Sequence, residues 1–295
     1  MKYMRYILTA ALCALSPTAS VIASADQPVH VVLFAGQSNM AGAGNYHALS
    51  SEDKARVEDA AKQVSLTYNG KSTAPLTYFT YSTEKYDFSD RFGPELFVGI
   101  ELAQANQDQE YLFIKRAQGG TALYGAWNPE WSADKSKAVE KGDRKQNLHL
   151  VDEHIAYIHQ ELTRLEAAGQ SYKIIGLLWM QGENDAAKEI SARSYEANLK
   201  QLIARYRREF NLPDMPFIYG QINSRYGNFE PGPTMVRQAM VDVANADSRA
   251  HVTLTTANPP WDDFPKHTDQ VHYNEVGQKR LGTAFAKSLI ELNQP

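Results

Sequence analysis

The feature that most constrains the fold of this 295-residue chain is a regular alternation of short apolar runs with long amphipathic stretches. The apolar runs have the length and composition of β-strands and are residues 29–34, 111–115, 174–180, 217–222 and 251–255. The amphipathic stretches have a helical period and are residues 94–106, 148–168, 192–210, 234–246 and 275–292. Strands that alternate with helices in this way form a parallel sheet with helices on both faces. The pattern therefore predicts an α/β sandwich around a parallel sheet.

The first 25 residues are expected to be a signal peptide rather than part of this fold. Lys2 and Arg5 form a positive start, residues 7–15 are almost entirely apolar, and residues 23–25 read Ala-Ser-Ala, a signal-peptidase pattern. The apolar stretch is shorter than the roughly 20 residues that span a bilayer. We therefore expect a single domain at residues 26–295, periplasmic or secreted from a bacterium, with no membrane anchor after cleavage. An uncleaved anchor is the alternative.

Composition limits the partners and the chemistry. The chain has 30 Lys and Arg against 34 Asp and Glu, a net charge of −4, and no basic run, so no surface for nucleic acid is indicated. The one cysteine, Cys13, lies in the leader, which leaves the mature chain without a disulfide or a thiolate nucleophile. His149, His154 and His159 recur every five residues and do not share one helical face, so no metal site is predicted. The oligomeric state stays open.

Two long polar segments interrupt the alternation, residues 45–90 and 124–144. Both come after glycine-containing strand ends, at the carboxyl edge of the sheet, where ligands bind in open α/β folds. Long irregular connections in compact domains are usually functional or disordered. We expect both segments to form walls of a substrate cleft, with a helix near residues 51–63. Surface decoration is the alternative.

A serine follows the first strand in the segment 36–40, Gly-Gln-Ser-Asn-Met. Glycines let the backbone turn sharply there, which would expose the Ser38 hydroxyl, and a following helix would direct N–H groups at developing negative charge. The segment is not a Gly-x-Ser-x-Gly elbow, because Met40 replaces the second glycine, and it lacks the ending of a phosphate loop. Taken alone, a serine in such a turn is more often a helix cap than a nucleophile.

A carboxylate and an imidazole lie three residues apart near the other end of the chain, as Asp269 and His272. The Asp269 side chain can accept the Nδ1 proton of His272, which leaves Nε2 free to take a proton from a serine. Alone, this spacing would most often be surface polarity or a helix cap. Together with Ser38 it indicates a catalytic triad.

Two further polar segments end intermediate strands: residues 119–121, Gly-Gly-Thr, and residues 181–185, Gln-Gly-Glu-Asn-Asp. Acyl transfer needs hydrogen-bond donors fixed where the carbonyl oxygen becomes an oxyanion. The N–H of Ser38, an N–H from Gly119 or Gly120, and the amide of Gln181 would supply three donors.

These segments, in this order, resemble the SGNH hydrolase superfamily and, within it, the sialate O-acetylesterase and acetylxylan esterase branch. Five segments carry the resemblance, which spans nearly the whole mature chain: residues 36–40, 92–95 (Phe-Gly-Pro-Glu), 119–121, 181–185 and 269–272. The resemblance implies a three-layer α/β/α sandwich with a flavodoxin-like parallel sheet and no cofactor. It also implies Ser38 as nucleophile, with Asp269 and His272 completing the triad.

The resemblance leaves part of the oxyanion hole open. It implies Ser38 and a backbone N–H from Gly119 or Gly120, of which we favour Gly120 because it precedes the turn into Thr121. The commoner superfamily pattern places Gly-x-Asn-Asp in the fourth segment, whereas this chain has Gln-Gly-Glu followed by Asn-Asp. We favour Gln181 as the third donor because it is nearest the strand end. Asn184 is the alternative.

The remaining site candidates surround these residues. Gln37, Asn39 and Gly119 flank the proposed reacting groups and are expected to support them or to contact substrate. Glu183 is expected to support the nucleophile turn by accepting hydrogen bonds. Glu95 follows Pro94 in the first turn of a helix, where negative charge is favourable.

Trp127, Trp131 and Trp261 are candidates for stacking on sugar, and equally for structural packing.

The sequence therefore predicts an exported serine carbohydrate acetylesterase that removes O-acetyl groups from sugars through an acetyl-enzyme. Its expected partner is an acetylated carbohydrate, either sialic acid or a xylan-type glycan. A non-catalytic carbohydrate-binding protein on the same fold is one alternative, and an SGNH lipase or thioesterase is another.

Overall fold

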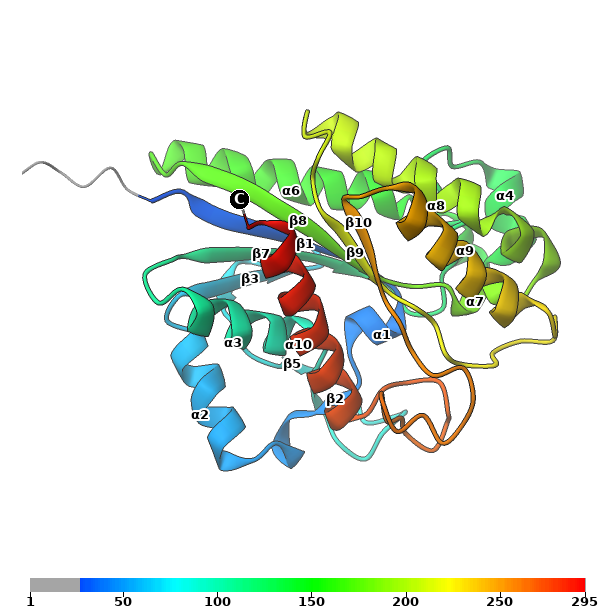
Figure 1. Cartoon of the computed structure of the whole chain (residues 1–295), viewed down its shortest axis with the longest axis horizontal. Coiled ribbons are helices and arrows are strands. Elements are labelled where there is room, and N and C mark those ends of the chain that lie inside the picture. The colour runs from blue at the N-terminus through cyan, green and yellow to red at the C-terminus, as the bar shows by residue number, and fades with distance from the viewer. Residues whose placement is uncertain (1–26, 295) are drawn as a thin grey trace, which may run out of the picture.

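The computed structural model describes residues 27–294, so the expected signal peptide lies outside the described residues (Figure 1). A seven-stranded sheet forms its centre. Its strands are β1 (Val29–Gly36), β3 (Val64–Tyr68), β4 (Ala74–Pro75), β7 (Tyr111–Ala117), β8 (Tyr172–Met180), β9 (Phe217–Gly220) and β10 (Ala250–Thr253). In space they follow the order β10-β9-β8-β1-β7-β3-β4. All neighbours pair in parallel except β3 and β4, which are antiparallel.

The order of the strands confirms the predicted fold. The stretch β7-β1-β8-β9-β10 has the flavodoxin-like order 2-1-3-4-5, with β3 and β4 added beyond β7. The chain leaves β1 towards the β3 and β7 side and later crosses to β8 on the other side of β1. Ligands bind at such a switch point, outside the carboxyl ends of the strands. The segment that begins at Ser38 leaves the sheet there.

Helices cover both faces of the sheet (Figure 1). One face carries α2 (Ser51–Ala60), α3 (Glu95–Ala105) and α10 (Glu275–Leu292), and the other carries α6 (Leu150–Ala167), α8 (Glu189–Glu209) and α9 (Gly232–Ala246). Short helices lie in the connections: α1 (Ser38–Ala41), η1 (Tyr46–Ala48), α4 (Ala133–Val139), α5 (Asp143–Gln146) and α7 (Glu183–Ala186). None of the helices within residues 27–294 has the length and apolarity needed to cross a membrane.

The core lies between the two helix layers and the sheet. Residues 31–35 of β1 are fully buried, as the continuous apolar run predicts for a strand covered on both faces. Phe34 packs against Phe113 of β7 with ring centroids 4.8 Å apart. Burial of each large apolar side chain stabilises the fold by about 1.5–3 kcal/mol. The central strand that carries Ser38 at its end is therefore firmly held.

Residues 45–90 differ from the polar insertion that the sequence suggests. The segment contains α2 near its expected place, but it also supplies β3 to the main sheet. A small second sheet has the order β2-β6-β5, with β2 (Gly44–Asn45), β5 (Phe79–Thr80) and β6 (Asp90–Phe92). The connection between β5 and β6 contributes Lys85 and Tyr86 to the site described next. Part of this segment is therefore core structure rather than a polar insertion.

Candidate active site

A tight turn joins β1 to α1 and places Ser38 at the first residue of the helix. Gly36 has φ +150°, and a Cβ there would lie 2.2 Å from the Met180 carbonyl oxygen, so only glycine permits this approach. The Gln37 N–H donates to the same carbonyl at 3.0 Å. The turn is thus fixed to the end of β8, and the Ser38 side chain stays partly exposed.

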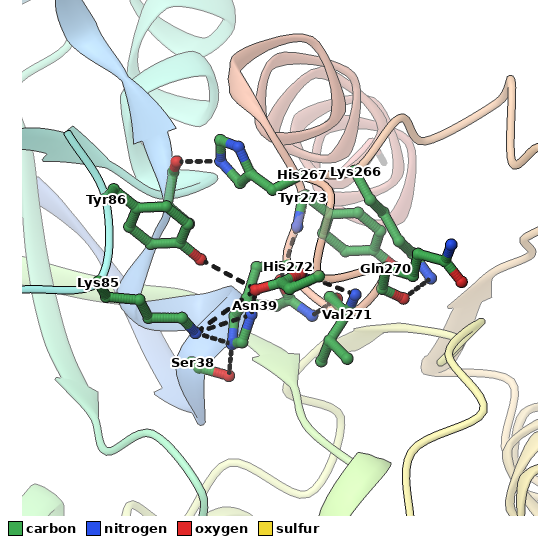
Figure 2. Close-up of polar contacts among 12 residues, drawn as sticks. Ser38, Asn39, Lys85, Tyr86, Lys266, His267, Gln270, Val271, His272 and Tyr273 are labelled. Atoms are coloured by element: carbon green, nitrogen blue, oxygen red, sulfur yellow. Dashed lines mark hydrogen bonds and ion pairs between the residues drawn. The ribbon is translucent and has the colours of Figure 1, made fainter. Parts of the chain in front are cut away.

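Three side chains from the two ends of the chain form one chain of hydrogen bonds (Figure 2). Ser38 Oγ lies 2.9 Å from His272 Nε2, and His272 Nδ1 lies 2.7 Å from Asp269 Oδ2. Asp269 Oδ1 also accepts from the N–H groups of Val271 at 3.0 Å and His272 at 2.9 Å. This arrangement fixes the proton on Nδ1 and leaves Nε2 as the acceptor for the Ser38 hydroxyl. The structure therefore brings together all three residues expected to form a triad.

The charges around His272 suit a general base. Burial opposes the charge on Asp269, but the N–H groups of His272 and Val271 and the imidazole together hold the pKa of Asp269 well below its usual value. Burial lowers the pKa of His272 most, and the positive charge of Lys85 lowers it further. The hydrogen bond and the negative charge of Asp269 raise it. His272 is therefore neutral at neutral pH, the form that accepts a proton.

Lys85 and Tyr86, from the connection between β5 and β6, complete the surroundings of His272. Lys85 Nζ lies 3.0 Å from Nδ1 and 3.3 Å from Nε2 of His272, and 3.6 Å from Asp269 Oδ2. Tyr86 Oη donates to Asp269 Oδ2 at 3.4 Å. These residues lie on one side of His272, with Val271 and Gln270 on the other (Figure 2). The sequence indicated a cleft wall in this segment but contained no motif that would single out either residue.

Glu183 accepts hydrogen bonds from both residues that flank Ser38 in the turn after β1. Its carboxylate accepts from Gln37 Nε2, and from Asn39 Nδ2 at 2.8 Å. Asn39 Nδ2 also donates to the Val271 carbonyl at 3.1 Å, and Asn39 Oδ1 accepts from the Tyr273 N–H at 3.0 Å. Asn39 therefore ties the turn that carries Ser38 to the loop that carries His272.

Backbone N–H groups without an acceptor lie in the Ser38 turn and in the loop after β7. Within residues 27–294, the N–H groups of Ser38, Gly119 and Gly120 have no hydrogen-bond acceptor. A Cβ at Gly119 would lie 3.4 Å from Ser38 Cβ, whereas a Cβ at Gly120 would lie 2.4 Å from Lys145 Nζ. Gly119 is thus the glycine in contact with Ser38, and both N–H groups remain candidates for binding an oxyanion.

The geometry contradicts the expected role of Gln181 in that site. Its side chain is fully buried, and Nε2 donates to the Thr121 carbonyl at 3.1 Å and to Asp185 Oδ2 at 2.5 Å. Both amide hydrogens are used, so Gln181 ties the Gly119–Gly120 turn to α7 and has none left for an acyl oxygen. Asn184 is half-buried, and its side chain makes no hydrogen bond in the described part of the chain.

Trp127 is also not placed for contact with sugar. It is fully buried, packs edge-on against Trp179 with ring centroids 5.1 Å apart, and donates from Nε1 to Thr121 Oγ1 at 3.2 Å. Trp131 stacks on His149, with ring centroids 3.7 Å apart. Trp261 is 6% exposed and lies under Lys266 Nζ, 3.8 Å from the ring centroid.

Glu95 forms a buried ion pair with Lys115. Its Oε2 is 2.6 Å from Lys115 Nζ, both side chains are fully buried, and Oε1 accepts from the Gly93 N–H at 3.0 Å. Lys115 also donates to the Ala41 carbonyl at 3.2 Å, at the end of α1. Glu95 therefore supports α1 through Lys115, a partner that the sequence did not reveal.

Asp185 anchors the loop after β7 from inside the protein. It is fully buried and accepts from the N–H groups of Leu123 at 2.8 Å and Tyr124 at 2.9 Å, as well as from Gln181. Burial raises the pKa of Asp185 to about 7, against the effect of these hydrogen bonds. Within residues 27–294, no three or more His, Cys, Asp or Glu side chains gather as metal ligands.

Comparison with family models identifies the family of this chain. The model of the family described as carbohydrate esterase, sialic acid-specific acetylesterase matches residues 28–291. A probable carbohydrate esterase of Arabidopsis thaliana is 25% identical over 282 residues, which are 91% of this chain and 93% of that protein.

Solved structures share the fold. The structure of an Arabidopsis thaliana protein has a TM-score of 0.64 at 20% identity and covers 90% of this chain and 99% of its own. The structure of NanS has a TM-score of 0.59 at 16% identity, with 90% and 98% covered. A carbohydrate acetylesterase from Xanthomonas citri has a TM-score of 0.54 at 16% identity, with 89% and 56% covered. With the family model matched over almost the whole described chain, this protein belongs to the sialic acid-specific acetylesterase family of carbohydrate esterases and is a carboxylic ester hydrolase.

Proposed function

We propose that this esterase is an exported serine enzyme that removes O-acetyl groups from sugars through an acetyl-enzyme. The observation that supports the serine mechanism most strongly is the chain of hydrogen bonds from Ser38 through His272 to Asp269, with distances of 2.9 and 2.7 Å. A carbohydrate-binding protein would not need these three side chains in register. Export is proposed from the composition of residues 1–25.

The proposed reaction has two halves. His272 Nε2 takes the proton from Ser38, whose Oγ attacks the acetyl carbonyl carbon and forms a tetrahedral oxyanion. The N–H of Ser38 and that of Gly119 or Gly120 stabilise this oxyanion. His272 then gives its proton to the departing sugar oxygen. In the second half, His272 activates a water molecule, which releases acetate and restores Ser38.

Asp269 keeps its charge throughout and stabilises the imidazolium that forms in each half. Glu183 and Asn39 act earlier, because they hold Ser38 at hydrogen-bonding distance from the base before substrate arrives. Positioning of this kind removes part of the entropic barrier to attack.

The proposed substrate class is an O-acetylated sugar, either sialic acid or a xylan-type glycan. The description of the matched family names sialic acid, and the structurally similar protein from Xanthomonas citri is a carbohydrate acetylesterase.

Acetate release separates the candidate functions. The substrates are 4-nitrophenyl acetate, O-acetylated sialic acid, acetylated xylan and a long-chain 4-nitrophenyl ester. We expect release from the aryl acetate and from at least one acetylated sugar, with the long-chain ester a poor substrate. Preference for the long-chain ester would support a lipase instead. No turnover of any ester by the folded protein would support the carbohydrate-binding alternative.

A further inference from the structure

The loop after β7, residues 118–127, contains the two glycines whose N–H groups are candidates for binding the oxyanion. Each residue of this loop lies outside the helices and strands of the described chain, so no regular hydrogen-bond pattern holds it. An oxyanion hole stabilises the transition state only when its donors are in place before the charge develops. The contacts that fix this loop therefore bear on the reaction.

Asp185, in the short helix α7 after β8, binds the loop through both of its carboxylate oxygens. Oδ1 accepts from the Tyr124 N–H at 2.9 Å, and Oδ2 accepts from the Leu123 N–H at 2.8 Å. Oδ2 also accepts from Gln181 Nε2, which in turn donates to the Thr121 carbonyl at 3.1 Å. Asp185 is fully buried. It therefore holds three residues of the loop, either directly or through Gln181.

Glu140, directly after α4, binds the same loop at two further N–H groups. Its Oε1 accepts from the Ala122 N–H at 2.8 Å and from the Ala126 N–H at 2.9 Å. Glu140 is 4% exposed, and within residues 27–294 its Oε2 has no hydrogen-bond partner. A single oxygen of Glu140 thus serves both donors. Together the two buried carboxylates accept four N–H groups of residues 122–126.

The turn just before this anchored stretch keeps its N–H groups available. Those of Gly119 and Gly120 have no acceptor in the part of the chain that the structure describes. A Cβ at Gly119 would lie 3.4 Å from Ser38 Cβ, so the turn contacts the residue that carries the nucleophile. The Gly120 carbonyl accepts from Lys145 Nζ at 3.0 Å. The turn is therefore tied at a carbonyl and at the residues that follow it, while two donors beside Ser38 stay free.

We propose that Asp185 and Glu140 are positioning residues of the reaction, which fix the Gly119–Gly120 turn beside Ser38 before the substrate arrives. The inference rests on the proposed function, because it gives the two carboxylates a role in stabilising the oxyanion. Both act through the backbone of residues 122–126. A turn held in this way does not have to reorganise when negative charge develops on the acyl oxygen, so its donors stabilise that charge fully.

The two carboxylates differ in a way that variants can test. Asp185 uses both oxygens, so Asp185→Asn places an N–H group opposite another donor and breaks a contact. Glu140 uses one oxygen, so Glu140→Gln keeps an acceptor for both N–H groups, whereas Glu140→Met removes it. Glu161→Gln is the matched control. It changes a carboxylate that is 6% exposed and lies with Val29 and Tyr111, at the amino ends of β1 and β7.

Acetate release from 4-nitrophenyl acetate and inhibition by trifluoroacetophenone measure the effect. In Asp185→Asn and Glu140→Met, kcat should fall by roughly 10- to 100-fold with KM little changed, since both halves of the reaction pass through an oxyanion. Glu140→Gln should keep most of the activity that Glu140→Met loses. The rates are measured at alkaline pH, because burial raises the pKa of Asp185 to about 7 and the ionised carboxylate accepts all three hydrogen bonds.

Inhibition by the ketone reports on the oxyanion hole rather than on stability. Addition of Ser38 Oγ to its carbonyl carbon gives a tetrahedral oxyanion, so its inhibition constant should rise in Asp185→Asn and Glu140→Met by a factor similar to the fall in kcat. Glu161→Gln should keep the kcat and the inhibition constant of wild type, whatever it does to the melting temperature.

The outcomes separate this proposal from the proposed function. Folded Asp185→Asn or Glu140→Met protein with the kcat and inhibition constant of wild type would overturn the positioning role and leave the proposed function intact. Glu140→Gln as impaired as Glu140→Met would also overturn it, because the hydrogen bonds to the loop would then not be the cause. If Asp185→Asn does not fold, the two Glu140 variants decide. If wild type releases no acetate from any ester, the proposed function fails and this proposal fails with it.

Discussion

At the scale of single residues, the positive charge of Lys85 lowers the pKa of His272, the proposed base. The groups that face the His272 ring are Ser38, Asp269, the Lys85 ammonium, and at longer range Glu183. Asp269 and Glu183 stabilise the imidazolium, whereas Lys85 destabilises it. The Nδ1 hydrogen goes to Asp269, so the ammonium acts on the ring through its charge.

Replacing Lys85 with Gln should move the acid limb of kcat/KM to higher pH. The positive charge lowers the pKa of His272, so its removal raises that pKa. Protonation then inactivates the base at a higher pH than in wild type. The measurement is kcat/KM for 4-nitrophenyl acetate across the acid range, with Lys85→Arg as the control that keeps the charge and the wild-type limb. An acid limb that stays in place in Lys85→Gln would contradict this account.

The sequence indicated the three residues of the Ser38–His272–Asp269 hydrogen-bond chain better than it indicated their neighbours. Ser38, Asp269 and His272 were recognisable because a glycine turn and a three-residue spacing are local features. The contact of Gln181 with Thr121 was not, because the two residues meet only after β7, β1 and β8 assemble side by side. Burial of Trp127 was hidden for the same reason, since Trp127 packs against Trp179 of β8, 52 residues later in the chain.

At the scale of elements, the Glu95–Lys115 pair joins α3, β7 and the end of α1. The pair has a 2.6 Å contact with both side chains fully buried, and Lys115 Nζ also lies 4.8 Å from the Tyr68 ring centroid. Removal of one partner from a buried pair leaves an uncompensated charge, which costs more than the pair contributes.

Lys115→Met should lower the free energy of unfolding by about 3–5 kcal/mol, because it leaves the Glu95 carboxylate buried without its partner. The double variant Lys115→Met/Glu95→Leu should recover much of that loss. Urea denaturation measures both. Lys279→Met is the matched control: Lys279 pairs with Asp53 at 2.7 Å but is 40% exposed, so its loss should cost about 1 kcal/mol or less. Equal losses for the buried and the exposed lysine would argue against this interpretation of the pair.

The elements themselves were predictable where their pattern was long or continuously apolar. β1, β7 and β8 and the long helices fall close to their expected ranges. β3 was not recognised, because its five residues alternate Val64, Leu66 and Tyr68 with Ser65 and Thr67 inside a polar segment. Its pairing with β7 over the full length of the strand, a tertiary contact, makes it part of the main sheet.

At the scale of the whole molecule, acid should destabilise the fold through a buried histidine. His154 in α6 is fully buried, with Nδ1 2.8 Å from Tyr206 Oη and Nε2 3.2 Å from the Ile114 carbonyl. Burial lowers the pKa of His154 to about 3 from 6.5. Between these values the unfolded chain binds a proton that the folded protein does not, so stability falls as the pH drops below 6.5.

Comparison with His154→Gln isolates this effect from other titrating groups. Between the pKa of His154 in the unfolded chain and its pKa in the folded protein, each drop of one pH unit should lower the free energy of unfolding of wild type by about 1.4 kcal/mol more than that of the variant. Urea denaturation at several pH values measures the difference, although His154→Gln itself is expected to be less stable at neutral pH. Parallel stability curves for the two proteins would show that His154 does not contribute.

The topology of the whole molecule explains why distant residues meet at one site. Ser38 follows the central strand β1, and the loop that carries Asp269 and His272 returns to the same sheet edge just before α10. A parallel sheet with its strand ends on one edge predicts such a meeting. The β5–β6 connection that brings Lys85 to this site required the small second sheet, which no pattern in the sequence indicated.

The most direct test of the central claim is the rate of acetate release by Ser38→Ala, measured beside wild type on 4-nitrophenyl acetate. Ser38 is a small, partly exposed side chain, so the variant should keep the circular dichroism spectrum and melting temperature of wild type. The account predicts that kcat falls roughly 10⁴-fold or more. A folded Ser38→Ala protein that retains wild-type turnover would contradict the assignment of Ser38 as the nucleophile, and with it the proposed mechanism.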